Sequence, residues 1–248
     1  MAKIKLSDIP TTPPKKLEKE TVKVATDKLL EELDELQNLL YAQHKYSVLI
    51  ILQGMDASGK DGVIRNVFGT LNPLGVSAQA FKAPTEEELD HDFLWRIHQH
   101  APAKGRIQVF NRSHYEDVLV QRVHKWVDED TIYKRMKAIN DYEGLLSEHN
   151  NTQILKFYLH VSQEEQRQRL EERTQEPRKM WKYNENDIKE AKLWKQYRKA
   201  YEDVFEECSQ VPWIIVPSDA NWYKEHIVAK TVRDTLKGLK MKYPMLKR

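Results

Sequence analysis

Residues 46–62 read YSVLIILQGMDASGKDG, and this stretch decides the fold. Its first part, Tyr46–Leu52, is an almost continuous apolar run, as expected for a strand buried on both faces of a parallel sheet. Its second part, Gly54–Gly62, has the spacing G-x-x-x-x-G-K of a phosphate-binding loop (P-loop). A tight glycine turn beside an exposed lysine is the other interpretation, but the buried strand before the motif favours the P-loop.

The residue types of this loop suit an anion. Gly54 and Gly59 allow the backbone to wrap closely with its N–H groups pointing inward, and the helix that follows adds its positive N-terminal end. Lys60 places a point charge on phosphate oxygens. The loop comprises Gly54, Met55, Asp56, Ala57, Ser58, Gly59, Lys60, Asp61 and Gly62.

Two carboxylates distinguish this loop from the usual pattern. Asp61 stands where a Ser or Thr commonly ligates Mg²⁺, and Asp56 lies inside the loop itself. Together they indicate a metal that is organised by carboxylates. We favour Asp56 as the ligand, because Asp61 is also suited to the first turn of a helix, where a carboxylate is stabilised anyway.

Outward from the loop, short β-rich runs alternate with helical patterns. This order predicts a P-loop kinase-like, three-layer α/β/α fold with a largely parallel sheet of about five strands. We expect strands at 46–52, 76–81, 106–110, 154–161 and 213–216. We expect helices at 21–43, 61–71, 86–100, 114–124, 129–149, 163–173, 186–207 and 222–240. Residues 1–20 are expected to form an irregular arm, and residues 21–248 a single domain.

Composition narrows the class of protein. The 248 residues carry 40 Lys+Arg against 38 Asp+Glu, which argues against a purely electrostatic nucleic-acid binder. A hydrophobic share of 40% is enough for a core, and one Cys excludes an intrachain disulfide framework. No apolar run is long enough to span a bilayer and no signal-peptide pattern is present, so we expect a cytoplasmic protein without membrane contact. Five of only eight glycines lie within residues 54–75.

A second cluster of polar residues follows the strand expected at 106–110. It reads NRSHYED over residues 111–117. Arg112 is placed to clamp a transferred phosphate, and the end of a neighbouring strand often supplies a second acidic metal group. Here the acids are Glu116 and Asp117; the alternative is that both lie on the surface of a helical first turn.

A third cluster spans residues 162–194. Ser162 and Glu165 form a capping-box pattern that begins a helix. Six basic residues follow between positions 167 and 182, and the stretch 177–182 (PRKMWK) contains no acid. Nearby glutamates favour a solvated charged face. The acid-free stretch between two helices favours a mobile basic lid, around residues 170–195, over an anionic substrate.

With these clusters in hand, the sequence resembles the second polyphosphate kinase family over roughly residues 20–240. The resemblance rests on GMDASGKDG at 54–62, FNRSHYEDVLV at 110–120, the lid-like stretch at 169–197 and WIIVPSD at 213–219. It implies functional roles for Asp56, Lys60, Arg112, Asp117, Arg173, Lys179 and Lys182. Because Asn111 and Glu116 replace the Asp and Asn of some relatives, the chain looks like the class III subgroup, which is associated with both nucleoside mono- and diphosphates.

The resemblance implies phosphoryl transfer from inorganic polyphosphate to AMP and/or ADP, reversible in principle. Mg²⁺, with Mn²⁺ as an alternative, would bridge through Asp56 and Asp117, while Glu116 would help to hold the acceptor or a second metal. The donor requires dense positive charge. It would come from Lys60, Arg112, Arg169, Arg173, Lys179 and Lys182.

The sequence alone leaves two other interpretations of the function open. One is an ATP-dependent P-loop kinase of a nucleotide or another small molecule, and a second is a non-catalytic module that binds polyphosphate or nucleic acid. The paired carboxylates favour the enzyme, so we expect no nucleic-acid partner. The helix at 21–43 and the many Trp and Tyr residues are compatible with a homo-oligomer, a dimer or tetramer.

Overall fold

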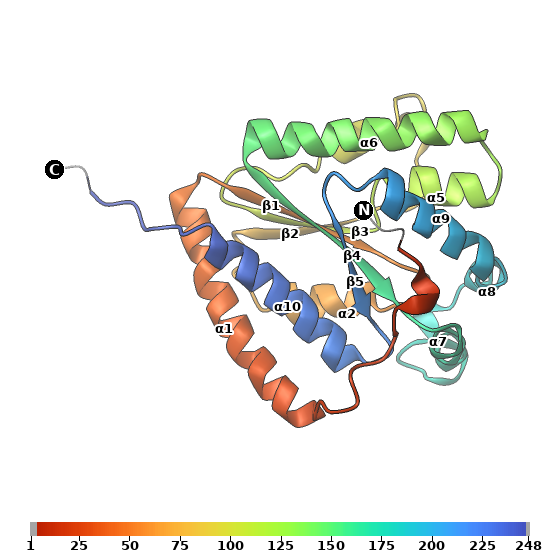
Figure 1. The fold of residues 1–248 in the computed structure, drawn as a ribbon, viewed down its shortest axis with the longest axis horizontal. Helices are drawn as coiled ribbons and strands as arrows, with labels where there is room; N and C mark the ends of the chain where they lie inside the picture. Colours follow the sequence, from red (N-terminus) through yellow and green to blue (C-terminus); the bar gives the residue numbers. More distant parts are fainter. Residues whose placement is uncertain (1–3, 247–248) are drawn as a thin grey trace.

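The apolar run within residues 46–52 forms the central strand of a parallel sheet (Figure 1). The computed structural model describes residues 4–246. In order across the sheet, the five strands are β2 (Val76–Ala80), β3 (Ile107–Asn111), β1 (Ser47–Gln53), β4 (Thr152–His160) and β5 (Trp213–Pro217). All neighbouring strands are parallel, so their carboxyl ends meet at one edge of the sheet. The five predicted strands are therefore confirmed.

Helices cover both faces of the sheet, which confirms the three-layer architecture (Figure 1). One layer contains α1 (Lys19–Gln43) and α10 (Asn221–Gly238); the other contains α5 (Glu116–Val123), α6 (Glu129–Asn150) and α9 (Trp194–Glu207). Strand β1 is buried along its whole length because alternate side chains enter opposite cores. Val48, Ile50 and Leu52 pack with α1 and α10. Leu49 and Ile51 pack with α5, α6 and α9.

Three predicted helices are interrupted. The helix expected at 86–100 is two single turns, α3 (Glu86–Leu89) and α4 (Trp95–His98). The helix expected at 61–71 is α2 (Lys60–Val63), continued by a π-turn over Ile64–Phe68. The helix expected at 186–207 divides into α8 (Glu185–Ala191) and α9, because the chain turns at 192–193 to bury Trp194 in the core.

The predicted capping box at Ser162 forms only in half. Ser162 accepts a hydrogen bond from the Glu165 N–H (3.1 Å) and begins α7 (Gln163–Gln175). The Glu165 carboxylate does not return to the N-cap; it accepts instead from Arg169 at 2.8 Å, one turn further along the helix. The Ser162 N–H donates instead to the Asp219 carboxylate (2.7 Å), so the N-cap donor that Glu165 would have bound is already bonded.

The described part of the N-terminal arm is tied to the sheet. Over residues 4–18 it forms one 3₁₀ turn, Leu6–Asp8, and Leu6 is buried. His160, at the end of β4, binds the carbonyl oxygen of Leu6 through Nε2 (3.1 Å), and Thr11 donates to Asp219 after β5 (2.6 Å). The described part of the arm is fixed to the carboxyl ends of β4 and β5, and α1 begins at Lys19, within the range predicted for the arm.

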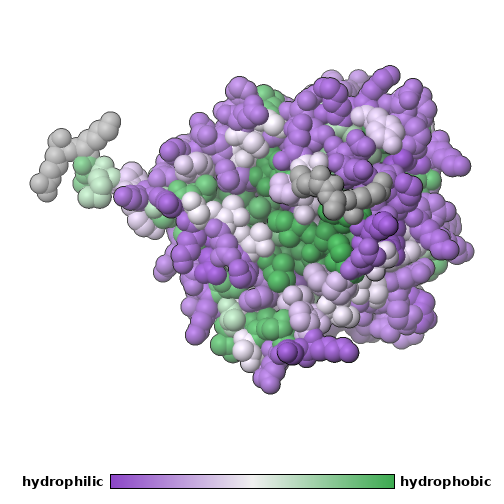
Figure 2. Space-filling model, viewed as in Figure 1, coloured by the Kyte–Doolittle hydropathy of each residue, from purple (hydrophilic) through white to green (hydrophobic). Residues whose placement is uncertain are grey.

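The surface of the molecule is mostly polar. Figure 2 shows hydrophilic side chains over most of one face and an apolar area near its middle, where Figure 1 places β5. Strand β5 is an edge strand, and its Ile214 and Ile215 are only partly buried. The oligomeric state stays a prediction. Within residues 4–246, no helix is both long and apolar enough to cross a membrane.

A buried ion pair lies beneath the segment that follows β3. Lys156 of β4 and Glu143 of α6 are fully buried and 2.7 Å apart. Tyr115 donates to Glu143 (2.7 Å) and accepts from Lys156 (2.8 Å). Burial lowers the pKa of Lys156, whereas Lys156 and His114 hold the pKa of Glu143 below its usual value despite burial. The pair thereby anchors the 111–117 segment to the core.

We expect Lys156→Met to lower the free energy of unfolding by about 3–5 kcal/mol, because it leaves the Glu143 carboxylate buried without its partner. Urea unfolding followed by circular dichroism measures the change. The double variant Lys156→Met/Glu143→Leu should recover most of the loss, since neither charge then remains. A double variant as unstable as the single one would contradict this interpretation.

Candidate active site

The P-loop connects β1 to α2 at the carboxyl edge of the sheet. Its backbone is left-handed at Gly59 (φ 96°) and at Ala57 (φ 59°), a conformation that a non-glycine residue rarely adopts. Gly54 has a φ of 150°, and a Cβ there would lie 2.8 Å from the carbonyl oxygen of Leu159 on β4. The loop therefore requires glycine at position 54 because β4 passes so close behind it.

Side chains from the loop itself and from α7 bind the loop's carbonyl oxygens. Lys60 donates from Nζ to the carbonyls of Gly54 (2.7 Å) and Met55 (3.1 Å). Gln166 donates to the carbonyl of Asp56 (3.0 Å), and Arg169 to that of Ala57 (3.0 Å). These bonds turn the carbonyl oxygens toward the protein, which favours an anion at the N–H side. Burial, aided by Arg112, lowers the pKa of Lys60 to about 8.

Arg112 joins the P-loop to the segment after β3. Its guanidinium binds the Asp56 carboxylate at 2.5 Å and the Glu116 carboxylate at 2.8 Å. The backbone of Arg112 is left-handed (φ 63°), and its N–H donates to the carbonyl of Leu52 on β1 (3.0 Å). The negative charge of Glu116 is the largest influence on the pKa of Arg112 and raises it. Burial opposes this effect and the charge of Asp56 adds to it, so that the pKa is raised overall. The structure thus brings together three residues that the sequence predicted for one site.

Asp117 lies in different surroundings. Its carboxylate is buried and lies 3.5 Å from the Arg96 guanidinium of α4. Burial raises the pKa of Asp117, against the opposing charges of Arg96 and Arg135. Its metal-binding role stays a prediction.

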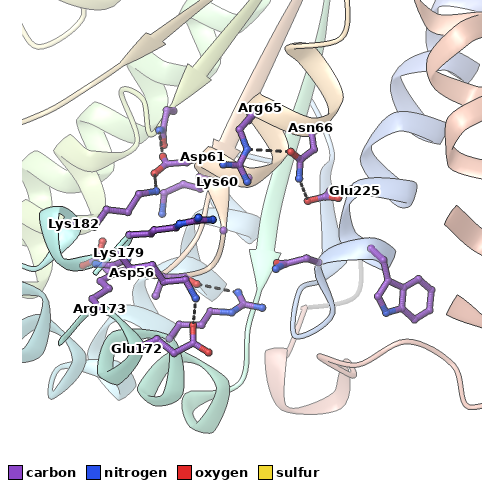
Figure 3. Close-up of a pocket in the computed structure, with 18 of the residues that line it drawn as sticks. Asp56, Lys60, Asp61, Arg65, Asn66, Glu172, Arg173, Lys179, Lys182 and Glu225 are labelled. Carbon is purple, nitrogen blue, oxygen red and sulfur yellow. Dashed lines mark hydrogen bonds and ion pairs between the residues drawn. The ribbon is translucent and has the colours of Figure 1, made fainter. Parts of the chain in front are cut away.

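Asp61 contacts the lid segment, residues 170–195. It accepts from Asn111 (2.9 Å) and from Lys182 of the 3₁₀ turn Met180–Lys182 (2.8 Å; Figure 3). Burial alone would raise the pKa of Asp61, but the bonds from Lys182 and Asn111 outweigh it and lower the pKa. The pair therefore connects the start of α2 with the lid segment.

Other lid cations are paired within the lid region. Lys179 binds Glu172 (2.7 Å) and Glu176 (2.9 Å), and Arg173 binds Asp187 at the start of α8. Within the acid-free stretch, Lys179 therefore finds its carboxylates on α7 and at the C-cap of that helix, as the charged-face interpretation expects. Lys182 differs, because its partner belongs to the P-loop.

Two cavities adjoin the P-loop. The larger, which we call the basic cavity, measures about 1380 Å³. All the predicted cations line it: Lys60, Arg112, Arg169, Arg173, Lys179 and Lys182. Lys19, Lys23 and Arg65 also line it, and sequence reasoning missed all three. Lys19 and Lys23 belong to α1, which is distant from the loop along the chain, and Arg65 lies in the π-turn after α2, where nothing local marks the side it faces.

The smaller cavity, which we call the aromatic cavity, measures about 800 Å³. Its lining includes Trp126, Trp194, Tyr197 and Tyr201, together with Glu116 and Asp117. Asp56 and Arg112 line both cavities, so they stand where the two adjoin. Of the two tryptophans, Trp194 is buried, whereas Trp126 is 64% exposed.

The carboxylates suit a magnesium ion only in company with a phosphate. Within residues 4–246 no group of three or more His, Cys, Asp or Glu residues is arranged to hold a metal. Mg²⁺, however, commonly binds through one or two carboxylates plus substrate phosphates and water. Asp56 meets this requirement because it lines the basic cavity beside the P-loop; Asp61 and Asn111 lie nearby on the same cavity wall.

A parallel α/β sheet, a P-loop after its central strand and a cationic lid segment define a P-loop kinase-like phosphotransferase. Comparison with known proteins gives the family. The model of the polyphosphate kinase 2 (PPK2) family matches residues 16–244, and the chain belongs to that family.

Individual proteins with polyphosphate kinase or polyphosphate phosphotransferase names are similar to this chain over most of its length. The AMP/ADP-polyphosphate phosphotransferase of Meiothermus ruber is 48% identical over 218 residues, which cover 87% of this chain and 81% of the relative. The ADP-polyphosphate phosphotransferase of Rhodopseudomonas palustris is 43% identical, over 87% and 79% of the two chains. The crystal structure of polyphosphate kinase 2 from Arthrobacter aurescens is 39% identical, with a TM-score of 0.96 over 100% of this chain and 90% of that one.

We expect binding of inorganic tripolyphosphate to weaken as the pH rises through about 8, where Lys60 loses its charge. Only the protonated lysine attracts an anion, so affinity is highest below this pH. Isothermal titration calorimetry between pH 7 and 9.5 measures the dissociation constant. In Lys60→Arg the charge persists above pH 12, so the decline near pH 8 should flatten; an equal decline in both proteins would contradict the assignment.

Proposed function

We propose that this chain transfers a phosphoryl group from inorganic polyphosphate to AMP and ADP, forming ADP and ATP. The carrying observation is the position of Arg112: it lines both cavities and binds Asp56 of the P-loop and Glu116 of α5 at once. A group at that boundary can contact donor and acceptor phosphates together. The named activities of the relatives from Meiothermus ruber and Rhodopseudomonas palustris support the same reaction.

The basic cavity suits the donor. Polyphosphate carries about one negative charge per phosphate, so a long chain needs cations spread along its path. Lys60 and Arg112 lie at the P-loop end of the cavity wall, Lys182 reaches the same end from the lid segment through Asp61, and Lys19 and Lys23 belong to the first turns of α1. The paired lid cations can exchange their carboxylates for phosphate oxygens as the donor binds.

The aromatic cavity suits a nucleotide. Trp126, Trp194 and Tyr197 supply apolar ring surface, and Arg112 supplies a guanidinium for the acceptor phosphate. A mono- or diphosphate bound with its base among the rings would direct its phosphate toward the boundary between the cavities. Breadth for AMP and ADP is part of the proposal and rests on the Glu116-containing motif and on the name of the 48% identical relative.

Phosphoryl transfer needs alignment and charge stabilisation more than covalent chemistry. Lys60 and the backbone N–H groups of the P-loop orient the donor, and Arg112 stabilises the charge on the transferred group. Asp56 holds the Arg112 guanidinium in place and is the residue we propose for Mg²⁺, with Mn²⁺ as a substitute. A bound divalent cation neutralises phosphate charge in such reactions. No phosphoenzyme is required.

Product analysis tests the proposal directly. AMP and ADP are each incubated with polyphosphate and Mg²⁺, and separately with ATP as donor, and the nucleotides are separated by ion-exchange chromatography. We expect ADP and ATP to form from polyphosphate. Phosphorylation of a non-nucleotide acceptor by ATP alone would establish an ATP-dependent small-molecule kinase instead, and binding of polyphosphate without any product would establish a binding module.

We expect Arg112→Lys to lower kcat/KM at least about 100-fold although it keeps the charge, since an ammonium cannot span two carboxylates as the planar guanidinium does. Arg167→Lys is the matched control. Arg167 is an exposed α7 residue that pairs with Glu164 and Glu171, so this change should leave kcat/KM within about twofold. Equal effects of the two changes would contradict the role of Arg112.

A further inference from the structure

Behind the P-loop lies a lysine that sequence reasoning did not single out. Lys224, in the first turn of α10, has no solvent exposure. Its ammonium donates to the side-chain oxygen of Asn221 (2.8 Å) and to the carbonyl oxygen of Ser58 in the P-loop (3.3 Å). Among the described residues, no carboxylate forms a salt bridge with it. A fully buried ammonium without a carboxylate partner is costly, so its position calls for a reason.

The contact with the loop is close. A Cβ on Gly59 would overlap the Lys224 ammonium, so the lysine occupies the space that any side chain at position 59 would need. Gly59 immediately precedes Lys60, and its peptide group belongs to the anion-binding turn. Lys224 therefore sets the position of the Ser58–Gly59 peptide from the side opposite the basic cavity, whose lining includes Gly59 but not Lys224.

Two positive and two negative groups act on the Lys224 ammonium. Arg169 of α7 and Lys60 of α2 disfavour its protonated form, whereas Glu225 of α10 and Glu165 of α7 favour it. Burial is the largest influence, and together these groups lower the pKa of Lys224 to about 7. Glu165 is itself bound by Arg169 at 2.8 Å. Because no described carboxylate bonds the Lys224 ammonium directly, an anion in the P-loop would add negative charge that favours its protonated form.

We propose that Lys224 is a positioning residue for the phosphate donor: from behind the P-loop it holds the Ser58–Gly59 peptide and adds a positive charge that a bound polyphosphate stabilises. The inference rests on the proposed function, because it concerns the same donor site. It makes donor binding depend on the protonation of a residue that touches no substrate. Binding an anion near pH 7 then draws a proton onto Lys224, and affinity falls as the pH rises through that range.

The test compares Lys224→Met with Lys230→Met. Methionine keeps the length of the side chain without its charge, and Lys230 is an exposed residue of the same helix that pairs only with Asp234. Calorimetry gives the dissociation constant of inorganic tripolyphosphate at pH 6 and 7.5, and initial rates give the KM of polyphosphate and of AMP. For Lys224→Met we expect both donor constants to rise about tenfold at pH 6 and the KM of AMP to stay within about twofold.

The pH dependence separates a positioning role from a merely structural one. Between pH 6 and 7.5, the affinity for tripolyphosphate should fall more in the wild-type and Lys230→Met proteins than in Lys224→Met. The reason is that residue 224 of this variant cannot take up a proton. Equal donor constants and equal pH dependence in Lys224→Met and the wild-type protein would overturn the inference. So would a rise in the KM of AMP as large as that of polyphosphate.

A further measurement covers the case that Lys224→Met does not fold. Titrating Lys60→Met with tripolyphosphate at pH 7.5, in two buffers of different ionisation enthalpy, counts the protons taken up without a contribution from Lys60. Net uptake beyond that of the ligand supports the inference, and its absence overturns it. Failure of the wild-type protein to bind tripolyphosphate at all would instead overturn the proposed function, so the two failures are distinguishable.

Discussion

The structure depends on holding several cations around one loop of backbone. Each carbonyl oxygen from Gly54 to Ser58 accepts a hydrogen bond from a side chain or a nearby N–H, and three of the donors are the charged residues Lys60, Arg169 and Lys224. Strand β1, buried on both faces, gives these groups a rigid base. Without carbonyl and carboxylate partners, so much like charge would repel; with them, the loop is preorganised for an anion.

Most of the fold could be predicted from local sequence patterns. The strand–loop–helix order around Tyr46–Gly62 predicts the central strand and the P-loop, and alternating runs predict the five parallel strands, because each signal lies within a few neighbouring residues. Breaks inside helices were missed where tertiary packing decides, as at Trp194. Arg112 and Glu116 could be predicted from their motif, but the direction of Asp117 could not, since its partner Arg96 lies on α4. Lys224 resembles any helical lysine until α10 is placed against the loop.

Acidic and basic residues are balanced in number over the whole chain but are unevenly distributed around the site. The sequence carries nearly equal numbers of acidic and basic residues, yet the lid segment and P-loop concentrate cations on one cavity. Their partners, including Glu172, Asp187 and Asp61, keep the region near neutral while no anion is bound. The more exposed of these pairs, Lys179 with Glu172 and Lys182 with Asp61, contribute little to stability and are readily exchanged. The same residues can therefore serve both the resting protein and a polyanionic substrate.

The N-terminal arm has a consequence for how the chain is made. Its Leu6 and Thr11 leave the ribosome before their partners His160 and Asp219, which follow roughly 150 and 200 residues later. At about 5–20 residues per second, translation leaves the arm without those partners for on the order of ten seconds or more. Contacts so distant in sequence also form slowly once the chain is complete. The bond between Thr11 and Asp219 thus forms only after strand β5 has been translated.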